Sequence, residues 1–218
     1  MKKIVLFSSL LVLSATFGSV AASAVEPTST ASFEFTTEKE GEETVNPPVD
    51  PTKPILPETG NKGQLVIDAV SNLDFGQTTI GGGQTVVTAS VPEKETLGIQ
   101  VTDKRGEGQG WNVKAKISKF QDQTEPEKQL RAAEVKIPKG TFKTVANGDI
   151  ANPPVVANEA GTVIGEENTL IFSAAKDKGM GSWVHDWSDQ VQLTIPAGNH
   201  VGAYSATITW EISNTPEK

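Results

Sequence analysis

The stretch Tyr204-Ser205-Ala206-Thr207-Ile208-Thr209-Trp210-Glu211-Ile212-Ser213 alternates apolar and polar residues over ten positions. Such alternation predicts a β-strand with one buried face, because successive side chains of a strand point to opposite sides of a sheet. A helix with a period of 3.6 residues cannot separate the two kinds of side chain in this way. The residues predicted to share the buried face are Tyr204, Ala206, Ile208, Trp210 and Ile212.

A second stretch, Trp111-Asn112-Val113-Lys114-Ala115-Lys116-Ile117, repeats the pattern, so that two strands each carry a Trp-x-aliphatic triplet. Other runs rich in Val, Ile, Thr, Leu or aromatic residues are bounded by Gly, Pro, Asn or Asp, as strands commonly are. They cover residues 64–70, 84–91, 96–102, 133–138, 168–174 and 190–195. No segment has a convincing helical face. We therefore predict an all-β, antiparallel sandwich over residues 63–218.

The amino terminus has the features of a secretory signal peptide, residues 1–24. Lys2 and Lys3 precede a short apolar run, and Ala22-Ser23-Ala24 supplies the small residues of a cleavage site. The apolar run is too short to span a bilayer, and no later run reaches about 18 apolar residues. We therefore expect a secreted chain with no membrane insertion after cleavage.

The charge balance narrows the class of partner. Without Lys2 and Lys3 the chain has 17 basic and 27 acidic side chains, a net charge of −10. Nucleic acids and anionic membranes attract basic surfaces, so neither is an expected partner. The chain contains no cysteine, which means that disulfides cannot stabilise it and that it depends on a buried core.

Residues 25–62 are rich in Pro, Thr and Glu, and their apolar residues do not recur with a period. This composition predicts a disordered, partly extended linker that holds the folded domain at a distance. Within it, Leu56-Pro57-Glu58-Thr59-Gly60 matches the LPxTG pentapeptide that sortases recognise. Sortase substrates carry that motif near the carboxyl terminus, before an apolar segment and a basic tail. We therefore interpret the match as accidental.

Three connections are candidate sites, because long loops on a rigid sandwich commonly carry function. Residues 120–131 and 144–167 are either functional loops or tolerated insertions. The third, residues 179–189, places Trp183 and Trp187 in a polar stretch flanked by glycine. Their rings either lie on the surface, where they stack on sugar rings or fill a partner's pocket, or fold back to close an edge of the sandwich. We favour the surface role.

All four tryptophans are candidate binding residues, and no set of catalytic residues accompanies them. Trp111 and Trp210 lie at inward strand positions, where a core role is expected before direct ligand contact. His185 and His200 are the two histidines, and a single imidazole beside Asp186 is expected to belong to a solvated loop. Zinc would need several His or Cys ligands, and no calcium-ligand spacing is present. We expect neither enzymatic activity nor a cofactor or metal.

The chain resembles the WxL family of surface proteins from low-GC Gram-positive bacteria. The resemblance lies in Gly110-Trp111-Asn112-Val113 and in the terminal stretch 204–216, with support from residues 65–76 and from Gly179-Met180-Gly181-Ser182-Trp183. It covers the chain from about Gly63 onward. In this sequence Val113 and Ile212 replace the Leu of the two signatures, and since both are apolar and similar in size we expect fold and function to persist.

The resemblance implies a secreted, non-enzymatic protein whose carboxyl-terminal domain attaches non-covalently to the cell wall through peptidoglycan. It also implies assembly with other cell-surface proteins. The alternative is therefore a protein-interaction subunit of a surface complex, held at the wall through a membrane-anchored partner. A glycan-processing enzyme is a third and less favoured class. It would need a pair of carboxylates, but any chain with this many acidic residues contains such pairs by chance, so they are no evidence for it.

Overall fold

The computed structural model describes residues 29–39, 41–188 and 190–214. The chain divides into two compact units, Met1–Phe35 and Thr36–Lys218. In the described part of the first unit, Phe33 and Phe35 pack edge to face with ring centroids 4.7 Å apart. The predicted signal peptide, residues 1–24, lies outside the described residues. Within those residues no helix is long and apolar enough to cross a membrane.

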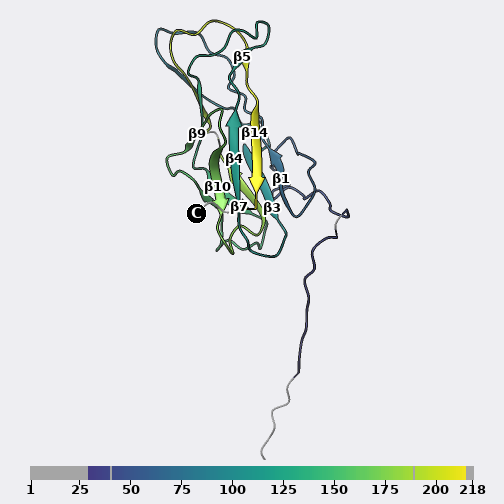
Figure 1. The fold of residues 1–218 in the computed structure, drawn as a ribbon. Helices are drawn as coiled ribbons and strands as arrows, with labels where there is room; N and C mark the ends of the chain where they lie inside the picture. The colour runs from purple at the N-terminus through teal and green to yellow at the C-terminus, as the bar shows by residue number, and fades with distance from the viewer. Residues whose placement is uncertain (1–28, 40, 189, 215–218) are drawn as a thin grey trace, which may run out of the picture. The chain divides into compact units, whose positions relative to one another are not determined.

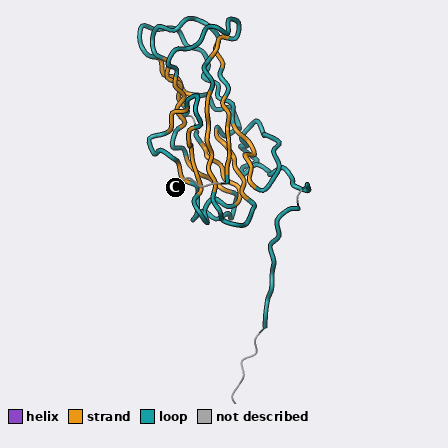
Figure 2. The backbone as a smooth tube through the Cα atoms, viewed as in Figure 1, coloured by secondary structure: helices purple, strands orange, loops and turns teal. Residues whose placement is uncertain are grey.

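The described part of the second unit forms strands and no helix, and every pairing between strands is antiparallel (Figures 1 and 2). One sheet has the order β1-β3-β11-β7 and a second the order β14-β4-β10-β8. A third sheet, β2-β12-β6-β9, and the pair β13-β5 complete the fold. The predicted all-β antiparallel sandwich is therefore confirmed.

The strand bounds are β1 (Leu65–Val70), β2 (Thr85–Thr88), β3 (Gly98–Asp103), β4 (Trp111–Ile117), β5 (Gln121–Asp122), β6 (Glu134–Ile137), β7 (Thr141–Thr144), β8 (Val155–Val156), β9 (Thr162–Ile164), β10 (Thr169–Ala174), β11 (Gly181–Asp186), β12 (Gln192–Ile195), β13 (Tyr204–Ser205) and β14 (Ile208–Ser213). The two strands with Trp-x-aliphatic triplets, β4 and β14, are neighbours, and Trp210 lies opposite Ala115. The distant sequence repeats therefore form one ladder.

The alternating terminal stretch behaves as predicted, with one difference. Its apolar side chains are half-buried and most of its polar ones are exposed. The run is broken between β13 and β14, and Trp210 is only half-buried, whereas Trp111 on β4 is fully buried. The difference arises because a cleft opens over this part of the inner face.

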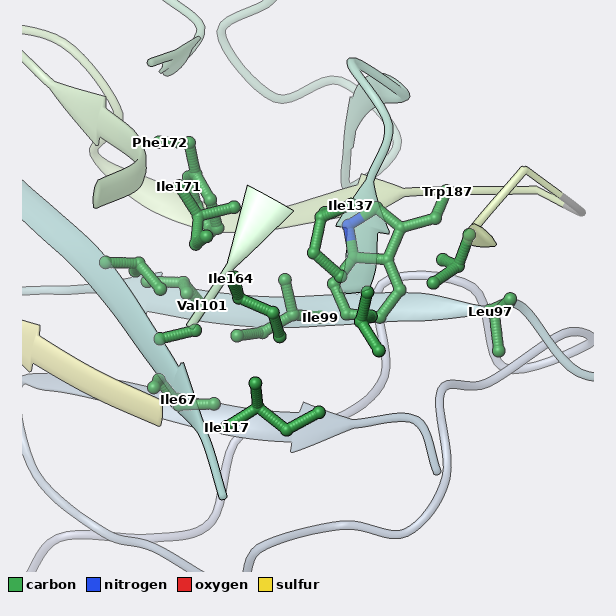
Figure 3. Close-up of a cluster of buried hydrophobic side chains, with 14 of the residues drawn as sticks. Ile67, Leu97, Ile99, Val101, Ile117, Ile137, Ile164, Ile171, Phe172 and Trp187 are labelled. Carbon is green, nitrogen blue, oxygen red and sulfur yellow. The ribbon is translucent and has the colours of Figure 1, made fainter. Parts of the chain in front are cut away.

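The core lies where the inner faces of the sheets meet. Ile99 from β3, Ile137 from β6 and Ile171 from β10 are fully buried together with Trp187, which follows β11 (Figure 3). Aromatic rings join the first two sheets: Phe142 of β7 contacts Phe172 of β10 with centroids 5.5 Å apart. Burial of this apolar surface is the main stabilising contribution available to a chain without cysteine.

The prediction of a disordered linker over residues 25–62 is wrong for residues 46–59, which pack on the first sheet. We call this segment the strap. Ile55 is only 3% exposed and forms a small second core with Ala69 and Val184, against which Val49 packs. The apolar residues of the strap are too few to produce a period, so its composition resembled that of a linker. The folded domain therefore begins before residue 63.

Hydrogen bonds fix the strap in place. Asn46 Nδ2 donates to Asp68 Oδ1 at 2.8 Å, and the backbone N–H of Val49 donates to Gln100 Oε1 at 2.8 Å. Gln100 Nε2 in turn donates to the carbonyl of Pro47 at 3.0 Å and to Asp68 Oδ2 at 3.1 Å. Prolines lack a backbone N–H, so the strap cannot pair as a regular strand, and side chains of the sheet supply part of its hydrogen bonds.

The LPxTG pentapeptide, residues 56–60, begins in the strap and ends one residue beyond it. Thr59 donates its backbone N–H to the carbonyl of Asp68 at 2.7 Å and its hydroxyl to the carbonyl of Ile67 at 2.7 Å. Glu58 forms a bridge with Ala69 of β1. The motif is thus paired with a strand of the folded unit.

Candidate functional site

The loop predicted at residues 179–189 is mostly a strand, and its tryptophans are buried. β11 occupies Gly181–Asp186, and Trp183 is only 3% exposed, with its Nε1 donating to the carbonyl of Met180 at 3.0 Å. Trp187 is fully buried. The surface role expected for both rings is therefore wrong. The missed signal is the spacing of Trp183, His185 and Trp187 at every second position, which places all three on the inner face.

His185 is a core residue and not part of a solvated loop. Its ring stacks on Phe142 with centroids 4.7 Å apart and meets Phe172 edge to face at 5.0 Å. Nδ1 accepts the Nε1–H of Trp187 at 3.1 Å, so Nε2 carries the proton and donates to the carbonyl of Lys139 at 2.7 Å. Burial lowers the pKa of His185 to about 4, which keeps the ring neutral.

Trp111 is also withdrawn from solvent. Its Nε1 donates to the carbonyl of Gly179 at 3.1 Å, and its ring meets Phe172 edge to face at 5.7 Å. Gly179 has a φ of +66°, and a Cβ built there would lie 2.4 Å from the Cβ of Ala174 and 2.9 Å from the Trp111 ring. A glycine is therefore required where the chain passes over this indole.

Trp210 is the one predicted binding residue that reaches a concave surface. Its ring stacks on the buried Trp187, with centroids 5.5 Å apart and an interplanar angle of 19°. It is half-buried and lines a cleft of about 1050 Å³. The buried indole thus supports a second indole that is open to solvent on the cleft side.

Two loops at the ends of strands build most of the cleft, residues 71–84 between β1 and β2 and residues 196–203 between β12 and β13. Figure 2 shows loops gathered at the end of the unit where Figure 1 labels β5. Phe120, Gln123 and Leu130 also line the cleft, so the predicted long connection 120–131 contributes to it. The described residues 144–167 are absent from its lining.

Local hydrogen bonds hold the 71–84 loop. Asp74 Oδ1 accepts the backbone N–H of Gly76 at 2.9 Å, and the carbonyl of Asp74 accepts the backbone N–H of Ser90 at 2.8 Å. Gly76 has a φ of +66°, which an Asp-x-Gly turn accommodates without strain. At the base of the loop, Ser71 donates its backbone N–H to the carbonyl of Gly98 at 2.9 Å. The cleft wall is therefore pinned at its base and at its first turn.

The 196–203 loop is tied to the 120–131 connection. Asn199 accepts the backbone N–H of Arg131 on Oδ1 at 2.7 Å, and its Nδ2 donates to the carbonyl of Pro196 at 2.9 Å. The hydroxyl of Tyr204 donates to the carbonyl of His200 at 3.1 Å. These bonds present Tyr204 at the cleft with its phenol engaged and its ring half-buried.

The cleft is nearly uncharged. Among its described lining residues there is no Lys, Arg or Glu, Asp74 is the sole carboxylate and His200 is the sole imidazole. Its lining contains both aromatic rings and amide or hydroxyl groups, including Phe75, Asn72, Gln77 and Thr79. The part of the chain that the structure describes contains no group of three His, Cys, Asp or Glu side chains that could hold a metal ion.

Sequence reasoning found Trp210 and the 120–131 connection of this site, and missed the 71–84 and 196–203 loops that build most of it. The stretch Leu73-Asp74-Phe75-Gly76 contained a usable signal, because an Asp-x-Gly turn marks the start of an ordered loop. The 196–203 loop has no comparable motif. Its place at the cleft follows from the pairing of β13 with β5, in which Tyr204 lies opposite Asp122.

A family model described as WxL domain, surface cell wall-binding, matches residues 22–216. Comparison with curated proteins and with solved structures finds no match. The matched region includes both Trp-x-aliphatic strands, the strap and the cleft loops. The chain therefore belongs to the WxL family of cell wall-binding surface domains.

Proposed function

We propose that the chain is a secreted, non-enzymatic protein that attaches to the peptidoglycan of the cell wall, without a covalent bond, through the Trp210 cleft. The observation that carries the proposal is the half-exposed Trp210 ring in an open cleft of about 1050 Å³. Ligand sites combine aromatic surface with a few orienting polar groups, and this cleft has both. The family's cell wall-binding character identifies the partner class.

The placement of the ionisable groups supports a non-enzymatic role. His185 is enclosed in the core with both ring nitrogens engaged, so it has no contact with a substrate in the cleft. His200 does line the cleft, and it is the one imidazole among the described lining residues. Glycoside cleavage generally requires two carboxylates flanking the bond. Asp74 is the one carboxylate of the described cleft lining, and its Oδ1 is bonded to the N–H of Gly76. The cleft is therefore suited to binding.

Docking onto another surface protein is the second candidate function, and one observation favours it. Val201 is 83% exposed and Ile80 is 53% exposed, and both line the cleft. Exposed aliphatic side chains around a concave surface are common in protein–protein interfaces. In this case a membrane-anchored partner would hold the chain at the wall.

Retention on protein-free peptidoglycan sacculi tests the proposal. The mature chain, residues 25–218, is mixed with sacculi and sedimented at low and at high salt. We expect retention that changes little with salt, because the described cleft lining offers no Lys or Arg side chain for ionic binding. A Tyr204→Ala variant should lose retention while the control Thr209→Ala, on the outer face of β14, keeps it. Absence of retention by the unaltered chain would refute the proposal and favour attachment through a protein partner.

A further inference from the structure

We infer that the cleft recognises the uncharged, N-acetylated glycan chain of the wall and not an acidic stem peptide or a phosphate-containing polymer. This inference rests on the proposed function and names the ligand class within the same site. Three properties of the described cleft carry it: its charge, the chemistry of its walls and its open form.

The charge of the cleft disfavours anionic ligands. Carboxylates and phosphates are recognised mainly by Arg, Lys or clustered N–H donors, because an anion that loses its water requires charge-assisted partners. No Arg or Lys is present among the described lining residues, and Asp74 adds a negative charge. The chain as a whole is acidic as well. An anionic polymer would meet this repulsion with no Arg or Lys to compensate it, and His200 is the one imidazole of the described lining.

The walls match a sugar chain. Sugar rings have apolar C–H faces and a rim of hydroxyl or N-acetyl groups, so they bind best between flat aromatic surfaces and neutral hydrogen-bonding groups. Trp210 and Tyr204 supply half-buried rings, and Asn72, Gln77 and Gln123 supply exposed amides. An amide can both donate to and accept from such groups without carrying charge.

The form of the cleft suits a polymer. Its volume of about 1050 Å³ reaches the upper end of the roughly 300–1,000 Å³ typical of small-ligand pockets, so several sugar units can be accommodated. Its rim is exposed along both loops, at Ile80 in the 71–84 loop and at Val201 in the 196–203 loop. A chain can therefore enter and leave the cleft at its open side.

Binding of three soluble probes to the mature chain tests the inference. The probes are a β-1,4-linked N-acetylglucosamine hexamer, a free acidic stem peptide and poly(glycerol phosphate), each titrated by calorimetry at low and high salt. We expect saturable, salt-insensitive binding of the hexamer alone. Binding of the peptide or of the phosphate polymer without the hexamer would overturn the inference.

Charge variants at Thr79, an exposed lining residue, give a second and independent readout. For an uncharged ligand, Thr79→Lys and Thr79→Glu should change the hexamer affinity by similar factors, within about threefold of each other. The reason is that the ligand carries no charge for either side chain to attract or repel. Affinity that rises with Lys and falls with Glu by about tenfold or more would indicate an anionic ligand and overturn the inference. Thr209→Lys and Thr209→Glu, on the outer face of β14, serve as matched controls.

The sacculus experiment separates the inference from the proposed function. Retention on sacculi without hexamer binding would leave wall attachment in place and refute the glycan as its ligand. Loss of retention together with loss of hexamer binding would refute both. Unfolding curves of every variant exclude loss of fold as the cause of a lost interaction.

Discussion

Val113 of β4 and Ile212 of β14 lie directly opposite each other, so the aliphatic residues of the two Trp-x-aliphatic triplets form one cross-strand pair. Because the strands are antiparallel, the tryptophans lie on either side of this pair along the ladder. Trp111 is enclosed beneath Gly179, whereas Trp210 reaches the cleft. The two signatures therefore form a single packing unit that has one tryptophan in the core and one at the candidate site.

Restoring leucine at the two signature positions should have unequal effects. Val113 is fully buried, so Val113→Leu adds volume to a filled core and should destabilise the domain by about 1–3 kcal/mol. Ile212 is only half-buried, and Ile212→Leu should cost less than about 1.5 kcal/mol. Urea unfolding followed by tryptophan fluorescence measures both changes. Equal losses would contradict the difference in burial.

Trp187 and Trp210 should separate stability from binding although their rings are stacked. Trp187→Ala removes a fully buried indole and should cost about 3–5 kcal/mol of unfolding free energy. Trp210→Phe keeps an aromatic ring on the stack and should cost less than about 1.5 kcal/mol. The same Trp210→Phe protein should be retained less well by sacculi. Unchanged retention by a folded Trp210→Phe protein would remove Trp210 from the binding site.

Alternation in the sequence was sufficient to predict β4, β14 and the buried position of Trp111. Trp183, His185 and Trp187 also recur at every second position, but the glycines and acidic residues around them obscured this strand pattern. Gly181, with a φ of +84°, is the first residue of β11, so this glycine lies where a strand begins and not within a loop. Cleft loops depend on long-range contacts such as Asn199 with Arg131, and local sequence pattern carries no record of such contacts.

The strap escaped prediction for a different physical reason. Its packing on the sheet depends on two apolar side chains, Val49 and Ile55, and on hydrogen bonds to polar side chains of the sheet. Composition averages over a segment, so two apolar anchors among prolines and acidic residues are hidden in it. Asp68 and Gln100 lie at buried positions of β1 and β3, and such side chains require hydrogen-bond partners from elsewhere in the chain.

Adjacent residues of the strap provide a matched test of its packing. Ile55→Ala removes a buried side chain from the second core and should cost about 2–5 kcal/mol of unfolding free energy. Leu56 is 40% exposed, so Leu56→Ala should cost only a small fraction of that amount. Chemical denaturation of the two variants side by side provides the comparison. A disordered linker would make both substitutions neutral.

The core position of His185 predicts a loss of stability in mild acid. Its pKa is lowered from 6.5 to about 4 by burial in the folded state, so between these values the unfolded chain binds the additional proton. Stability should therefore fall as the pH decreases from about 6.5 to 4, by about 3 kcal/mol in total. Burial raises the pKa of Asp68, which acts in the opposite sense, because the folded state then takes up the proton first and gains stability as the pH falls through that pKa.

A His185→Gln variant isolates the contribution of the imidazole. Glutamine can still donate to the carbonyl of Lys139 and accept from Trp187, but it does not titrate. The variant should be less stable than the unaltered chain at pH 7, because the stack on Phe142 is lost, and its unfolding free energy should depend less on pH between 6.5 and 4. The measurement is a series of urea unfolding curves for both proteins across this range. Identical pH dependence would mean that His185 is already solvated in the folded state, which its burial beside Trp187 argues against.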